Sequence, residues 1–156
     1  MANSRGVYTI PFTVTNPTTA PFLQLATPTN AGLMLLEFFV CQEAGETAEQ
    51  VAMTIARRTT ASTLPTAASV NKLDPTDASS RLASSTTTNA YGIASATGTL
   101  GDILARFAFD TRVGLFYAPS DVSVAMLMDI SQFLTFQFVA TPANNVYSGH
   151  VIIEEV

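Results

Sequence analysis

The stretch that decides the fold class is Gly6 to Thr15, which reads Gly-Val-Tyr-Thr-Ile-Pro-Phe-Thr-Val-Thr. β-Branched and aromatic residues dominate it, and such residues favour strands over helices. Val14 lies between two threonines, an alternation of apolar and polar residues that is typical of a strand with one buried face. Pro11 has no amide hydrogen to donate, so we expect this strand to run along a sheet edge or to contain a bulge.

Two further segments in the first third of the chain carry strand signals. Residues 33–42 are apolar on both faces apart from Glu37, and their length and bordering glycine favour a central strand over a short buried helix. Residues 50–57 place Val51, Met53 and Ile55 at every second position, which indicates a half-buried strand. A helix from Thr47 is the alternative there, because Thr47 and Gln50 have the spacing of a capping box.

Dense strand signals return in the last third of the chain. The short turn-forming stretch at residues 142–145 predicts that the last two strands form an antiparallel hairpin. With about eight or nine short strands and no clear helix, the chain is expected to be all-β, an antiparallel two-sheet β-sandwich with a jelly-roll-like arrangement. The strand segments expected here are residues 103–109, 114–117, 122–129, 133–141 and 147–156.

We expect one domain over residues 1–156, because the length suits a single core. Residues 1–6 are predicted to form a short N-terminal arm. Residues 59–101 are rich in Ser, Thr and Ala and predict a long irregular excursion with one or two strands. A loop of this length in a compact domain is usually functional or ordered by a partner.

The chain is poor in charge. Only 12% of its residues are charged while 47% are hydrophobic, and its net charge is −5. Ordinary domains carry about 25% charged residues, so part of the surface is expected to be covered by other subunits. The alternative is that the protein works where charge matters little for solubility. With one lysine and six dispersed arginines, no basic surface for nucleic acid is predicted.

No catalytic, cofactor-binding or metal-binding residue is predicted. The chain has one cysteine, Cys41, and one histidine, His150, about 110 residues apart, so neither a disulfide within the chain nor a zinc site of soft ligands can form. Cys41 lies in an apolar run and is interpreted as a small buried residue. The sequence Asp74-Pro75-Thr76-Asp77 lacks the further ligands of a calcium loop and predicts a turn.

Several charged pairs receive structural interpretations. Arg57 and Arg58 are expected at an exposed strand end that interrupts aggregation. Residues 154 and 155 are both glutamate, and they are expected to point to opposite faces of a solvated edge, so they cannot act as an acid/base pair. Asp102 and Arg106 could pair if their segment were helical.

Neither a secretory signal nor a membrane span is predicted. The first residues lack a continuous apolar core followed by a small-residue cleavage site. Residues 6–36 contain no charge, but four prolines interrupt them and Glu37 follows.

The order of features in the last third resembles a known class of proteins. Residues 107–119 read Phe-Ala-Phe-Asp-Thr-Arg-Val-Gly-Leu-Phe-Tyr-Ala-Pro, and residues 148–155 read Ser-Gly-His-Val-Ile-Ile-Glu-Glu. Upstream, Asn71-Lys72-Leu73-Asp74-Pro75 precedes Ala78-Ser79-Ser80. From about Asn71 to the end, these features resemble the small structural proteins with which tailed bacteriophages decorate or cement their capsids. Residues 121–132 are less polar than that resemblance leads one to expect.

The resemblance implies a non-enzymatic β-sandwich in the virion, assembled in the host cytoplasm and docked on the major capsid protein or another virion protein. It also implies a homo-oligomer, commonly a trimer. The N-terminal arm is polar and without strand signal, so we expect it to order on docking. Its residues are Met1, Ala2, Asn3, Ser4 and Arg5.

Two other functions remain open. One is a tail- or surface-associated binding module that recognises a receptor or a glycan, although the chain has no tryptophan and only four tyrosines for an aromatic platform. The other is an enzyme on a cupin-like scaffold, which the single histidine argues against.

Overall fold

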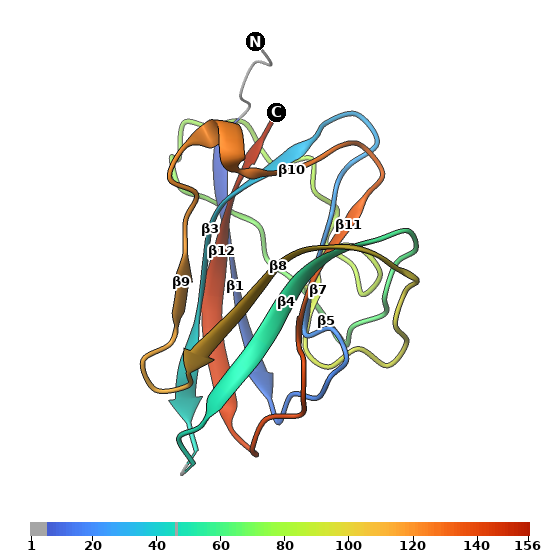
Figure 1. Ribbon diagram of the computed structural model, residues 1–156. Coiled ribbons are helices and arrows are strands. Elements are labelled where there is room, and N and C mark those ends of the chain that lie inside the picture. Colours follow the sequence, from blue (N-terminus) through green and yellow to red (C-terminus); the bar gives the residue numbers. More distant parts are fainter. Residues whose placement is uncertain (1–5, 46) are drawn as a thin grey trace.

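The computed structural model describes residues 6–45 and 47–156, and these residues form two antiparallel β-sheets packed face to face (Figure 1). The expected all-β, two-sheet sandwich is therefore confirmed. Within the described residues the helical content is limited to one 3-10 turn, η1 (Val122–Val124).

Six strands make up each sheet. The first sheet has the order β10-β3-β12-β1-β6, and β9 also pairs with β3; their bounds are β1 Gly6–Thr15, β3 Leu33–Ala44, β6 Asn71–Lys72, β9 Leu115–Tyr117, β10 Met126–Met128 and β12 Val146–Glu155. The second sheet has the order β5-β7-β2-β11-β4-β8, with β2 Leu23–Ala26, β4 Gln50–Arg58, β5 Thr66–Ala67, β7 Ala90–Tyr91, β8 Leu100–Asp110 and β11 Phe133–Phe138.

The strand pairs are nested along the chain. β1 pairs with β12, β2 with β11, β3 with β9 and β4 with β8, all antiparallel. The members of successive pairs alternate between the two sheets. Strands from the two ends of the described chain thus pair with each other, and each further pair lies inside the previous one in the sequence.

The strands expected near the N-terminus are confirmed. Residues 33–42 form most of β3, and residues 50–57 form β4 rather than the alternative helix. Pro11 lies on a sheet edge, because β6 pairs with β1 only at Tyr8 and Thr9 while β12 occupies the other side. A proline is tolerated where no partner strand needs its amide hydrogen.

The predicted C-terminal hairpin is wrong. β11 pairs with β2 and β4 in the second sheet, whereas β12 pairs with β1 and β3 in the first. Residues 139–145 therefore cross from one sheet to the other. The crossing places Phe138 and Tyr147 on facing inner surfaces, with ring centroids 5.1 Å apart, so both strands contribute aromatic area to one core.

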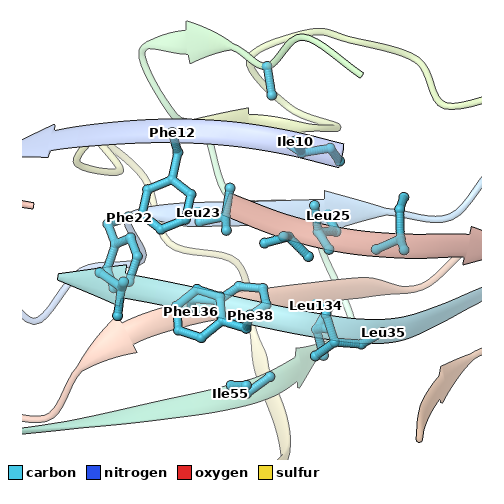
Figure 2. Close-up of a cluster of buried hydrophobic side chains, with 14 of the residues drawn as sticks. Ile10, Phe12, Phe22, Leu23, Leu25, Leu35, Phe38, Ile55, Leu134 and Phe136 are labelled. Carbon is cyan, nitrogen blue, oxygen red and sulfur yellow. The ribbon is translucent and has the colours of Figure 1, made fainter. Parts of the chain in front are cut away.

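The core consists of inward-pointing residues from both sheets (Figure 2). Phe38 of β3 stacks on Phe136 of β11 with ring centroids 4.6 Å apart, and Phe12 of β1 lies 5.7 Å from Phe22. These four rings are almost completely buried. Each such side chain contributes about 1.5–3 kcal/mol through burial, so this aromatic cluster holds the two sheets together.

The excursion at residues 59–101 is packed against the sandwich. Its short strands β5 and β7 extend the second sheet beyond β2, and β6 extends the first sheet beyond β1. Leu64, Ala68 and Leu82 are buried within it. The excursion therefore closes one flank of the sandwich, beyond β1 of the first sheet and β2 of the second.

Candidate interaction surface

The outer face of the second sheet is covered by the excursion through a buried polar network. The Gln24 amide on β2 donates to the backbone oxygens of Ser62, Thr87 and Thr88 at 3.3, 3.1 and 3.0 Å, and its Oε1 accepts from Ser62 N at 2.7 Å. Gln24 is completely buried. Because each of these polar groups has a partner, the excursion is held on the face in a defined position.

Arg58 belongs to the same network, which corrects the expectation of an exposed strand end. Its side chain is 7% exposed. Nε donates to Thr135 Oγ1 at 3.0 Å, and the two terminal nitrogens donate to the Gly98 carbonyl and to Gln137 Oε1. Burial lowers the pKa of Arg58 from its ordinary value. The sequence did not predict the burial of Arg58, because the accepting carbonyl belongs to Gly98, which lies far from Arg58 in the sequence.

Arg57 points to a different part of the molecule. Its Nη2 donates to the Leu127 carbonyl of β10 at 2.7 Å, which ties the second sheet to the first at one end of the sandwich. Its Nε is buried and has no hydrogen-bond partner among the described residues. A buried donor without an acceptor is energetically costly.

Two neighbouring hollows share Arg57 and Gln132. Their volumes are about 420 and 390 Å³. The first is lined further by Gly32, Leu127, Met128, Asp129 and Val156, and the second by Arg58, Thr59, Gly101, Asp102 and Ser131. The first lies beside β10 and the second beside the start of β8.

The bare flank is formed by β8, β9, β10 and the segments that join them, and we call these residues, 100–130, the bare flank. Of the nine large apolar side chains that are exposed in the described chain, seven belong to it: Leu100, Ile103, Val113, Phe116, Val124, Leu127 and Ile130. Val113 is 81% exposed and Phe116 63%. β8 lies at the opposite edge of the second sheet from β5, and β9 and β10 pair with β3 at the opposite edge of the first sheet from β6. Most of the large exposed apolar side chains of the described residues are thus concentrated in this part of the chain.

The outer face of the first sheet carries the histidine and the cysteine. His150 Nε2 lies 2.6 Å from Glu37 Oε1, and the imidazole stacks on Phe39 at 5.7 Å. The register places Cys41 on the same face, opposite Ser148 and two residue pairs along from His150. Cys41 is half-buried rather than buried as expected. Within the described residues no hydrogen bond joins its sulfur to His150, and a nucleophile needs such contact with its base.

Glu155 corrects a second expectation. β12 lies between β1 and β3 rather than at a solvated edge, and Glu155 is completely buried. Its carboxylate accepts from the Ser80 hydroxyl and from Arg81 N, the latter at 2.8 Å. Glu154 is half-buried on the opposite face. Glu155 thus holds the excursion to the first sheet, and the two carboxylates do not converge.

Two charged segments remain, the turn at Asp74 and the pair formed by Asp102 and Arg106. Asp74 forms the expected turn, accepting from Thr76 N at 2.8 Å and from the Thr76 hydroxyl at 2.7 Å. These hydrogen bonds lower the pKa of Asp74 from its ordinary value. Asp102 and Arg106 lie on strand β8, so the helical pairing does not form.

No group of three or more histidine, cysteine or acidic residues in the described ranges is placed to hold a metal ion. The described residues also contain no helix long and apolar enough to cross a membrane. The predicted docking residues Met1, Ala2, Asn3, Ser4 and Arg5 lie outside the described residues, and their role stays a prediction.

A third hollow, of about 500 Å³, lies between the end of β2 and the excursion. Asn30, Arg81 and Thr88 contribute polar groups to it, and Arg81 donates to the Asn30 carbonyl at 3.3 Å. Its lining contains no aromatic residue of the described chain.

No protein-family model matches the chain, and a search of curated proteins finds no match either.

Proposed function

We propose that this chain is a non-enzymatic structural subunit of a virion, a decoration or cement protein on the head of a tailed phage. The observation that carries the proposal is the bare flank, where seven large apolar side chains are exposed while the opposite flank is closed by the excursion. A subunit that buries this flank against a neighbour also accounts for the low charge of the whole chain.

The strand order supports the proposal by analogy. We infer that the sandwich is a jelly roll, because its strand pairs are nested from β1 with β12 down to β4 with β8. Jelly rolls are frequent in viral capsid proteins. A fold hosts many functions, so this analogy adds to the argument from the surface and does not replace it.

The proposed partners are further copies of this chain and a shell protein such as the major capsid protein. The bare flank presents apolar side chains, which suit a protein partner with apolar residues of its own. The trimer that the resemblance implies is a prediction that a solution mass tests.

The proposal is tested on virus particles. Particles that lack the chain are purified, incubated with the recombinant protein and separated on a density gradient. We expect the protein to travel with the particles at a fixed stoichiometry and to raise the temperature at which they release DNA. If it stays at the top of the gradient at every concentration, the proposal is wrong.

A matched pair of variants locates the docking surface. Leu127 on the bare flank and Leu73 outside it are 51% and 50% exposed, so replacing either with serine removes the same exposed apolar area. We expect Leu127→Ser to weaken particle binding at least tenfold and Leu73→Ser to leave it unchanged. Equal losses would place the docking surface elsewhere.

A binding module that recognises a receptor or glycan is the second candidate. The hollow with Asn30, Arg81 and Thr88 favours it, because its amide, guanidinium and hydroxyl groups match the hydrogen-bonding groups of a sugar. A glycan array tests this candidate, and a saturable ligand that Arg81→Ala abolishes would move the proposal to this hollow.

A further inference from the structure

Strand β8 has a long edge without a partner strand in the described structure. It spans Leu100–Asp110 and pairs only with β4. Natural edge strands are usually protected by charged residues, especially lysine, by proline, by a bulge or by very short length, and β8 has charged residues and register shifts only at some of its positions. β8 contains neither lysine nor proline and has 11 residues, so its outer backbone groups before Asp110 are open to another strand, whereas the Asp110 carbonyl accepts from Gly114 N at 2.9 Å.

The part of this edge that is regular can be identified. The register between β4 and β8 shifts opposite Ile55, Ala56 and Arg58, where β8 contains residues 100–105. From Ala105 to Asp110 the pairing with β4 is continuous. A partner strand therefore finds its straightest template at residues 105–110.

We propose that the occupant of this edge is β8 of a second copy, paired antiparallel about a two-fold axis at Ala108. In that register Arg106 faces Asp110 of the other copy, and Asp110 faces its Arg106. Phe107 likewise faces Phe109. Opposite charges placed directly across an antiparallel pair are favourable, and the symmetry makes the same pair twice.

Charge decides among the nearby registers. An axis at Arg106 would bring the two arginines together and set Asp102 against Asp110, which is repulsive. An axis at Leu104 would pair Asp102 with Arg106, but it would run through the shifted part of β8. The axis at Ala108 combines opposite charges with the regular part of the strand.

In the single chain, the side chains of Arg106 and Asp110 are placed to form these pairs. Arg106 is exposed and makes no hydrogen bond or ion pair with any described residue. Asp110 Oδ1 accepts from Arg112 N at 2.9 Å, which fixes the carboxylate at the end of the strand.

This contact deepens the proposed function. It rests on that function in one respect, because the function supplies the reason why copies of the chain associate. A two-fold contact closes at two subunits, so it predicts a dimer or an even-numbered assembly where the resemblance implies a trimer. Light scattering coupled to size exclusion decides between these masses. A clean trimer, or a monomer at every concentration, overturns the contact.

A cysteine at the axis tests the register directly. In antiparallel strands the Cα atoms of directly opposed residues are about 4.5–5.5 Å apart, which a disulfide spans. We expect Ala108→Cys, in a Cys41→Ser background, to form a covalent dimer under mild oxidation. Ala52→Cys is the matched control, because Ala52 lies opposite Ala108 on β4 and its copies would be about 14 Å apart. Equal cross-linking of both variants overturns the register.

A charge exchange gives a second, independent test. Arg106→Asp turns both attractive pairs into repulsive ones, and we expect dimer affinity to fall at least tenfold. Adding Asp110→Arg should restore dimerisation, because the pairs are then reversed. Failure of the exchange together with failure of the cross-link overturns the proposal. A dimer that never joins particles contradicts the proposed function alone, and a particle-bound monomer contradicts the contact alone.

Discussion

The outer face around Gln24 and the edge formed by β8 belong to the same sheet, yet they differ in what covers them. On the face, a buried amide and a buried guanidinium group bind the excursion. At the edge, Ile103 and Leu100 are exposed and the strand has one neighbour. Hydrogen bonds require one geometry, whereas exposed apolar area accepts any complementary surface. The covered face is therefore held by a defined set of contacts, whereas the outer side of the edge has no partner strand in the described structure.

The largest expected effect breaks the covered side. Gln24→Ala would leave Ser62 N and the carbonyls of Thr87 and Thr88 without their side-chain partner. Because unsatisfied buried groups cost about 1–3 kcal/mol each, we expect the free energy of unfolding to fall by about 3–5 kcal/mol. Urea unfolding measures this change.

Gln50→Ala is the control for that variant, because Gln50 is exposed at the start of β4. We expect it to change the free energy of unfolding by less than about 0.5 kcal/mol. Limited proteolysis supplies a second measurement, since the excursion of Gln24→Ala should be cut faster than that of the native chain. Equal stability of the two variants would show that the network does not hold the excursion.

The adjacent arginines sharpen the comparison. Arg58→Met leaves Thr135 and Gln137 without a donor in a buried place, so we expect a loss of about 2–3 kcal/mol. Arg57→Met removes one hydrogen bond at the exposed end of the sandwich, and we expect a loss of under about 1 kcal/mol. Thermal and urea unfolding measure both variants. A larger loss of unfolding free energy for Arg57→Met than for Arg58→Met would show that the contacts of Arg58 do not hold the covered face.

The strands were predictable from the sequence because alternation is local. Val51, Met53 and Ile55 point to the core as their spacing indicates. The C-terminal hairpin was not predictable, since a seven-residue connection can join strands in one sheet or cross to the other. The partners of β11 come from β2 and β4, far along the chain.

The burial of Arg58 and Glu155 could not be predicted either, because their partners Gly98 and Ser80 belong to the excursion. Low charge predicted that some surface would be covered. The low charge did not show which part of the surface is covered, because residues 103–109 and the central strand β11 have similar apolar patterns. Only the sheet order identifies β8 as the edge.

Two tyrosines compare the core with the bare flank through pH. Burial raises the pKa of Tyr147, which lies in the core, and of Tyr117, which lies half-buried on β9, above the ordinary value of 10.0. Above pH 10 the unfolded chain therefore releases a proton that the folded chain keeps. Stability is fully present below pH 10 and falls as the pH rises, by at most about 1.4 kcal/mol per pH unit and group.

We expect Tyr147→Phe to reduce this alkaline loss more than Tyr117→Phe does, because Tyr147 is completely buried. Urea unfolding between pH 8 and pH 11 gives the slopes. An unchanged slope in Tyr147→Phe would mean that other groups cause the loss.

The smallest effect on the isolated subunit is expected at the bare flank. Ile103 is 58% exposed and points away from the core, so Ile103→Thr should change the free energy of unfolding of the monomer by less than about 0.5 kcal/mol. If copies associate through this edge, the native protein melts at a higher temperature as its concentration rises, because association stabilises the folded state. Ile103→Thr should weaken that dependence while leaving the melting temperature at high dilution unchanged. A variant that melts earlier at every concentration would instead make Ile103 part of the subunit's own stability, and the edge would then resemble the covered face.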